Sequence, residues 1–291
     1  MTPRIDRVVT VDWSAASTPK VGADSIWICT HLPAEARTEV VNPATRREAE
    51  RLLALLCAEP GRTLMAADVA LAYPAGSAAA AGLTSESGRP AWTALCAHLH
   101  DALHDDHRNR NNRWDVAAEL NRRIGSAQFW GAPAARSGPW LPVRRPNSPS
   151  LPWFRRSEDE LRRRGLRPSS PWQLLGVGSV GSQSLTFAPV AHRLRAAHPD
   201  RVAVWPIETG AVSDPWRGRR HGTVLAESWT SLPPADAVRA VDQPVRDARQ
   251  VVALAHWLAE LAHTGSPLFR PPSALRHRDV LDEEGWVLGL V

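Results

Sequence analysis

Two short runs of β-branched and apolar residues, each ending in an aspartate, set the tightest limits on how this chain folds. The first run spans residues 8–12 and ends in Asp12, and the second spans residues 63–68 and ends in Asp68. Runs of this length and composition are typical of strands buried inside a sheet. In open α/β sheets, functional side chains gather at the carboxyl ends of the strands. The two runs therefore predict an α/β fold with both aspartates at its functional edge.

The residues between the two runs supply three more elements. Residues 25–30 alternate in strand fashion, and residues 39–41 fit a third strand after a turn. Apolar residues then recur at helical spacing over residues 45–58, until a Pro-Gly pair ends the helix. We therefore expect three antiparallel strands, a crossover helix and a fourth strand that is parallel to the first.

The rest of the chain divides into an irregular middle and a regular end. With 291 residues, of which 43% are hydrophobic, the chain suits a single domain over 1–291 with a largely helical and irregular insertion at about 75–199. Helices are expected there at residues 91–103 and 116–124. Two strand candidates follow at residues 201–208 and 222–227, and a last helix is expected to begin near Pro244.

Carboxylates at the ends of these elements are the candidates for a catalytic metal site. The four candidates are Asp12, Asp68, Glu227 and Asp247. Cleavage of a phosphodiester with Mg²⁺ or Mn²⁺ needs several carboxylates from different elements, because these hard cations take oxygen ligands. Glu208 is an alternative third acid, but Pro206 perturbs the strand before it, so Glu227 is preferred. Each acid also has a structural explanation, as the cap of a turn or as a negative charge at a helix N-terminus.

Six motifs resemble a known family. They are VDWSA at 11–15, ADVALAYP at 67–74, WQLLGVGSVG at 172–181, WPIETG at 205–210, DARQ at 247–250 and EEGWVLG at 283–289. Together they resemble the ribonuclease-H-like family catalogued as domain of unknown function 429. The resemblance covers most of the chain and implies a ribonuclease-H-like mixed sheet flanked by helices, together with a nuclease role. It also implies that Asp12, Asp68, Glu227 or Glu208, and Asp247 form the site.

Basic residues indicate how a substrate could be bound. The net charge of +5 and the isoelectric point near 10.0 favour polyanionic partners. Arg155 and Arg156 follow two aromatic residues, an arrangement that could bind the phosphate backbone of a nucleic acid while the aromatic rings stack on bases. The alternative for these arginines is an ordinary solvated surface.

Two loops add further candidates for substrate contacts. Gly178 and Ser179 belong to a glycine-rich segment that could bring backbone amides close to a phosphate, unless its glycines serve only close packing. The segment also has the spacing of a dinucleotide-binding loop, but no clear strand precedes it. Ser14 and Lys20 follow the first strand and faintly resemble the first phosphate loop of actin-like ATPases and sugar kinases.

These features predict a cytoplasmic, nuclease-like phosphodiester hydrolase that uses magnesium or manganese and acts on a nucleic acid or a nucleotide. An actin-like small-molecule kinase and a catalytically inactive ribonuclease-H-like binding scaffold are the alternatives. No apolar run is long enough to span a membrane, and the three cysteines show no disulfide or zinc-ribbon spacing. Cys96, His100, His104 and His107 recur at helical spacing and are a rival candidate for a transition-metal site, with a solvated polar face as the alternative explanation for His104 and His107.

Overall fold

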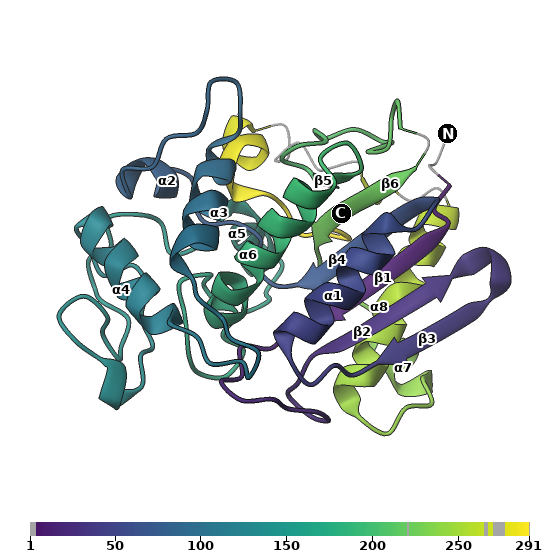
Figure 1. Ribbon diagram of the computed structural model, residues 1–291, viewed down its shortest axis with the longest axis horizontal. Helices are drawn as coiled ribbons and strands as arrows, with labels where there is room; N and C mark the ends of the chain where they lie inside the picture. The colour runs from purple at the N-terminus through teal and green to yellow at the C-terminus, as the bar shows by residue number, and fades with distance from the viewer. Residues whose placement is uncertain (1–3, 220, 265–266, 270–276, 291) are drawn as a thin grey trace.

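A mixed sheet of six strands forms the core of one half of the molecule, on the right in Figure 1. The computed structural model describes residues 4–219, 221–264, 267–269 and 277–290. The strands are β1 (Arg7–Asp12), β2 (Trp27–Leu32), β3 (Arg37–Val41), β4 (Arg62–Asp68), β5 (Val202–Val204) and β6 (Gly222–Glu227). Their order across the sheet is β3-β2-β1-β4-β6-β5. The strands from β1 to β3 are antiparallel neighbours, whereas β1, β4, β6 and β5 run parallel.

The first part of the chain folds as its sequence predicts. Helix α1 (Arg46–Ala58) connects β3 to β4, and the hydroxyl of Thr45 caps it by accepting a hydrogen bond from the Glu48 amide. Strand β4 then pairs with β1 in parallel, and Asp12 lies directly opposite Asp68 in the register. The three antiparallel strands, the crossover helix and the parallel fourth strand are therefore confirmed.

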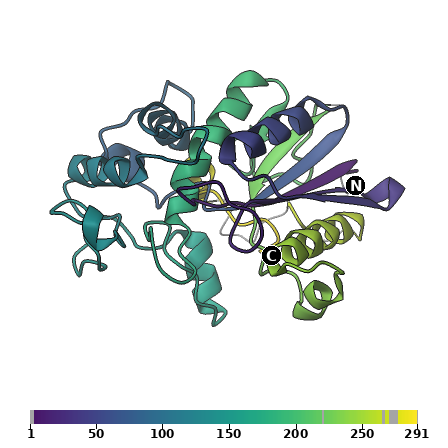
Figure 2. The same ribbon diagram turned by 60° about the horizontal axis from the view of Figure 1, so that its bottom comes forward.

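Helices cover both faces of the sheet (Figure 2). Helices α1 and α6 (Gly181–Ala197) pack on one face, where Val9 and Val11 share a core with both helices. Helix α8 (Arg246–His263) packs on the other face, where the Thr10 hydroxyl donates a hydrogen bond to the Val251 carbonyl at 2.7 Å. The short helix α7 (Ala235–Ala240) packs against α8. Because side chains alternate along a strand, Asp12 projects to the α8 face with Thr10.

Four helices and several loops form a second region beside the sheet (Figure 1). The helices are α2 (Ser77–Ala80), α3 (Ala91–Ala102), α4 (Arg113–Ile124) and α5 (Arg156–Arg163). Helices α2, α3 and α4 share an apolar core, which includes Leu99, Val116 and Trp172, whereas Leu161 of α5 packs in the core on the α8 face of the sheet. Helices α3 and α4 confirm the two helices expected in the insertion. Helix α6 also falls within residues 75–199, but it packs on the sheet.

The short π-helix η4 (Val280–Glu284), near the end of the chain, is joined to this second region by hydrogen bonds. The Glu283 carboxylate accepts hydrogen bonds from the Gly76 and Ala78 amides. The buried Glu284 carboxylate accepts bonds from the Ala75 amide at 3.1 Å and the Arg156 amide at 3.0 Å. These acids satisfy backbone donors that would otherwise be buried without a partner.

Replacing Glu284 with glutamine is expected to destabilise the protein, because glutamine leaves only one acceptor oxygen for two amides. One buried N–H then loses its partner, at a cost of about 1–3 kcal/mol in the free energy of unfolding. Urea denaturation measures this change. Glu86→Gln is the control, because the Glu86 side chain is 84% exposed and pairs with the exposed Arg89. Equal stability of both variants would contradict an anchoring role for Glu284.

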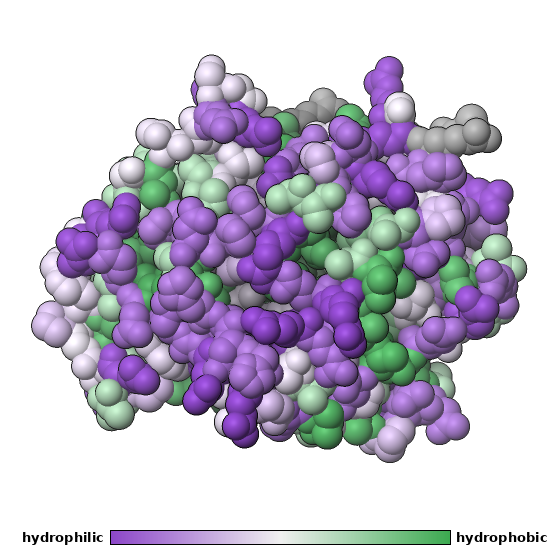
Figure 3. All heavy atoms as spheres, in the orientation of Figure 1, coloured by the Kyte–Doolittle hydropathy of each residue, from purple (hydrophilic) through white to green (hydrophobic). Residues whose placement is uncertain are grey.

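The face of the molecule shown in Figure 3 is largely hydrophilic. Polar side chains cover most of the face in Figure 3, and apolar residues form small groups between them. The large apolar side chains are concentrated in three buried clusters. None of the helices in the described ranges is long and apolar enough to cross a membrane.

Candidate functional site

Three aspartates meet at the carboxyl ends of the central strands. Asp12 ends β1, Asp68 ends β4, and Asp247 lies in the first turn of α8. Neighbouring strands are about 4.8 Å apart, and residues in register project to the same face. Asp12 and Asp68 therefore lie side by side on the face that α8 covers. Three of the four acids in the predicted site therefore lie near one another.

The Asp12 carboxylate is surrounded by negative charge. Burial raises its pKa to about 8, and the carboxylates of Asp68, Asp247 and Asp24 add to the shift. Among the described residues, no N–H or O–H group donates a hydrogen bond to Asp12. The turn after β1 is held instead by Ser14, whose hydroxyl accepts a bond from the Ala16 amide at 3.3 Å. A turn-capping role for Asp12 therefore does not fit the structure.

The other two aspartates each use one oxygen in hydrogen bonds. Asp68 Oδ2 accepts bonds from the Thr230 amide at 3.1 Å and the Thr230 hydroxyl at 2.5 Å. Burial raises the pKa of Asp68, and the Thr230 bonds oppose that shift. Asp247 Oδ2 accepts a bond from the Asp24 amide at 2.7 Å. In the part of the chain that the structure describes, neither Oδ1 receives a donor, so each aspartate keeps one oxygen for another ligand.

Glu227 ends β6 but lies apart from the three aspartates. It is in register with Ala67, the residue before Asp68, so it projects to the opposite face of the sheet. Its two oxygens accept bonds from Arg155 at 2.6 and 2.7 Å, and the Leu71 amide adds a third at 3.0 Å. Sequence reasoning grouped Glu227 with the aspartates by its place at a strand end, but did not resolve which face it occupies.

Arg155 is a buried counter-ion. Its side chain is 0% exposed, and its donors are all directed at protein groups: Nε at Glu158, Nη1 at Glu227 and the Glu284 carbonyl, and Nη2 at Glu158 and Glu227. Burial opposes the charge, but the two carboxylates raise the pKa of Arg155 above its usual value. The expectation that Arg155 contacts a phosphate backbone does not fit this position. Arg156 is partly exposed and pairs with Asp279 at 2.9 Å.

Glu208 is not part of the aspartate cluster. The strand expected over residues 201–208 ends at Val204, because Pro206 cannot continue the ladder of hydrogen bonds. Glu208 instead forms an ion pair with Arg195 of α6 and accepts a bond from the Val204 amide at 2.9 Å. The carboxylates that raise the Asp12 pKa are those of Asp68, Asp247 and Asp24, and Glu208 is not one of them. The expected strand end at Glu208 is therefore wrong.

The loop after β1 runs along the aspartate cluster. Lys20 forms an exposed ion pair with Asp24 at 3.5 Å, and the Ser14 hydroxyl donates to the Asp24 carbonyl at 3.3 Å. Both expected contact residues thus lie beside the cluster. The buried Arg46 of α1 supports the loop by donating to the Ser14 carbonyl at 3.1 Å and to the Ala16 carbonyl at 2.8 Å. Sequence reasoning missed Asp24 and Arg46, because their roles depend on contacts between distant segments.

The glycine-rich loop precedes helix α6. Gly178 has a φ of +71° and lines a pocket next to Asp68, while the Ser179 amide donates to the Gly176 carbonyl at 3.1 Å. Gly181 begins α6, and a Cβ atom there would come within 2.6 Å of the Gln173 carbonyl oxygen. Close packing therefore explains Gly181, whereas Gly178 faces the pocket.

The rival transition-metal site does not form. Helix α3 ends at Ala102, so His104 and His107 do not continue its face. The Cys96 thiol donates to the Ala188 carbonyl, and His100 stacks on His192 with ring centroids 4.4 Å apart. Within the described ranges, no three His, Cys, Asp or Glu side chains are arranged as a ready-made metal site, and this includes the aspartate cluster.

Comparison of the chain with protein-family models, with curated proteins and with solved structures found no match. The resemblance to domain of unknown function 429 therefore remains a prediction.

Proposed function

We propose that this protein is a metal-dependent phosphodiester hydrolase that holds one divalent cation, Mg²⁺ or Mn²⁺, at Asp12, Asp68 and Asp247. The observation that carries the proposal is the environment of the Asp12 carboxylate. It has three acidic neighbours, and none of the described residues donates a hydrogen bond to it. A nearby positive charge favours the ionised form of such a group. A divalent cation supplies that charge and would draw the three carboxylates together.

The donor set suits a hard cation. Asp68 and Asp247 each have an oxygen without a donor in the described part of the chain, and Asp12 has two. Oxygen ligands are those that Mg²⁺ prefers, usually with several waters retained. A bound cation would supply Lewis-acid polarisation of a phosphoryl oxygen. Glu227 is left out of the proposed site, because it projects to the other face of the sheet and Arg155 donates to both of its oxygens.

The residues around the cluster suit the binding of an anionic substrate. The loop after β1 carries Lys20 to the rim of the cluster, where it can offset the charge of an incoming phosphate. Asp68 is held in place by Thr230, so its free oxygen has a fixed direction.

The topology supports a ribonuclease-H-like fold as part of the proposal. Three antiparallel strands, a crossover helix and a parallel fourth strand place two aspartates in register at the centre of the sheet. Nucleic acids and nucleotides are the substrates that such a site would take, and the positive net charge suits them. A cytoplasmic location belongs to the same proposal.

Hydrolysis of bis(4-nitrophenyl) phosphate tests the proposal without assuming a particular natural substrate. We expect release of 4-nitrophenol by the wild-type protein with Mg²⁺ or Mn²⁺, and a rate at least about 100-fold lower for Asp68→Asn, because a positioned metal contributes several kcal/mol. Asp200→Asn, a change at an exposed acid outside the cluster, is the control and should keep the wild-type rate. A rate that chelation does not change would contradict the proposal, as would transfer of phosphate from a nucleoside triphosphate to a small acceptor.

A further inference from the structure

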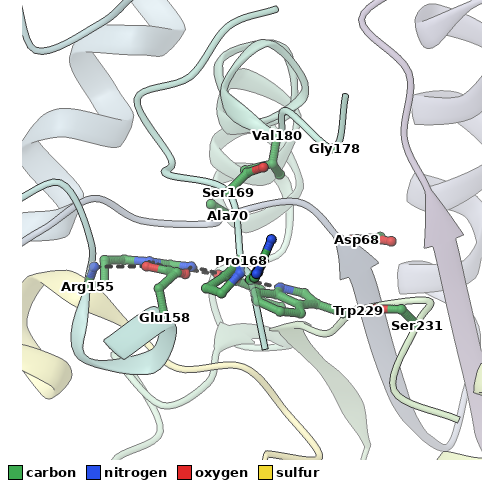
Figure 4. A pocket seen from close by; sticks show the side chains of 12 residues that line it. Asp68, Ala70, Arg155, Glu158, Pro168, Ser169, Gly178, Val180, Trp229 and Ser231 are labelled. Atoms are coloured by element: carbon green, nitrogen blue, oxygen red, sulfur yellow. Dashed lines mark hydrogen bonds and ion pairs between the residues drawn. The ribbon is translucent and has the colours of Figure 1, made fainter. Parts of the chain in front are cut away.

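A pocket opens beside Asp68. It has a volume of about 280 Å³ and lies between the ends of β4 and β6 and two loops of the second region. Figure 4 shows Asp68 on one side, Arg155 with Glu158 on the other, and Ser169 with Gly178 at a third wall. The pocket therefore begins at one of the proposed metal ligands.

Among the described residues that line the pocket, Arg167 has a positive charge that can bind an anionic ligand. The Arg155 guanidinium also lines the pocket, but Glu158, Glu227 and the Glu284 carbonyl occupy its donors. Arg167 is exposed, and none of the described residues forms an ion pair or hydrogen bond with its side chain. Arg155 pairs with both Glu158 and Glu227 and offsets one of their two charges, and burial raises the pKa of Glu227, which reduces the negative charge that remains.

Trp229 gives the pocket an aromatic wall. Its side chain is half-buried, and its indole N–H points at Glu227 Oε1 at a distance of 3.4 Å, which restricts the orientation of the ring. Pro168, Ala70 and Val180 add apolar surface around it. An indole held in this way offers a face on which a nucleobase can stack, and such stacking tolerates any base.

We propose that this pocket binds a single nucleotide unit of the substrate, with the base against Trp229 and a phosphate at Arg167. This inference rests on the proposed function, because it places the phosphate beside Asp68 and the proposed cation. A base in a duplex is stacked on both sides and must leave the stack before it can reach such a wall. The substrate class is therefore a single-stranded end or a free nucleotide, and a fully paired duplex is excluded from the pocket.

Binding of adenosine 5′-monophosphate to the full-length protein in the presence of a chelator tests the pocket separately from the metal site. Calorimetry should detect binding to the wild type. Arg167→Gln is expected to weaken binding of the monophosphate about tenfold and to leave binding of adenosine unchanged, because only the phosphate contact is lost. Trp229→Leu should weaken both ligands about tenfold or more, and Trp229→Phe should restore most of the affinity.

Arg164→Gln is the matched control, because Arg164 is an exposed arginine of the same region that pairs with Glu160 at 2.8 Å. It should bind both ligands like the wild type. Equal affinity in Arg167→Gln and Arg164→Gln would overturn the assignment of the phosphate contact, and absence of monophosphate binding at millimolar concentration would overturn the pocket. If the protein hydrolyses the small diester with metal but does not bind the nucleotide, the pocket assignment is wrong and the proposed reaction stands. If it binds the nucleotide but does not hydrolyse the diester, the proposed reaction is wrong and the pocket assignment stands.

Discussion

Replacing Arg155 with methionine is expected to lower the free energy of unfolding by about 3–5 kcal/mol. The change leaves two glutamates, each 2% exposed, without their shared counter-ion. Both carboxylates are almost fully buried, so one or both must take up a proton or the region must open. Chemical denaturation at neutral pH, followed by circular dichroism, measures the loss.

Two companion variants separate the charge from the packing of Arg155. The triple variant Arg155→Met, Glu158→Gln, Glu227→Gln removes all three charges and should recover part of the lost stability. Arg164→Met removes an exposed arginine and should change the unfolding free energy by less than about 0.5 kcal/mol. A loss below about 1 kcal/mol for Arg155→Met would show that Glu158 and Glu227 do not depend on this ion pair.

The Arg155 network also marks the limit of what the sequence predicts. Strand β1, helix α1 and strand β4 follow from local patterns of apolar residues, and these patterns were sufficient to place Asp12 opposite Asp68. Each of these elements is specified by side chains that are close in sequence. A last helix beginning near residue 244 follows in the same way, and it carries Asp247 to the same face.

The contacts of the acids could not be predicted in this way. Arg155 and Glu227 are 72 positions apart, and no periodic pattern links an arginine before α5 to the end of β6. Their pairing depends on how the second region packs against the sheet. The same applies to Thr230, which orients Asp68 across 162 positions. The prediction that a strand ends at Glu208 was wrong for a local reason, because Pro206 ends the strand before the chain reaches Glu208.

Asp12→Asn is expected to stabilise the protein without metal, with an effect that grows as the pH rises. The pKa of Asp12 is raised from 3.8 to about 8 in the folded protein. Between these two pH values the unfolded chain has lost a proton that the folded protein keeps, so folding becomes less favourable as the pH increases. Asparagine carries no such proton. At pH 8 the variant should be more stable by on the order of 2 kcal/mol, less than the full shift implies, because solvent reaches part of the side chain.

With divalent cations present, the wild type should instead be more stable than Asp12→Asn, because the cations stabilise only a protein with an intact site. At a free concentration of Mg²⁺ or Mn²⁺ about 100 times the dissociation constant, binding to the folded state adds about 2.7 kcal/mol to the stability of the wild type. Asp12→Asn removes one anionic ligand and the charge that attracts the cation, so its thermal midpoint should barely respond.

Glu227→Gln should still respond, because Glu227 lies outside the proposed site, even if its own stability is lower. Thermal unfolding of the three proteins at pH 8, with metal and with chelator, measures all of these effects. An equal metal response in wild type and Asp12→Asn would exclude Asp12 as a ligand, and a response lost only in Glu227→Gln would move the cation to the other face of the sheet.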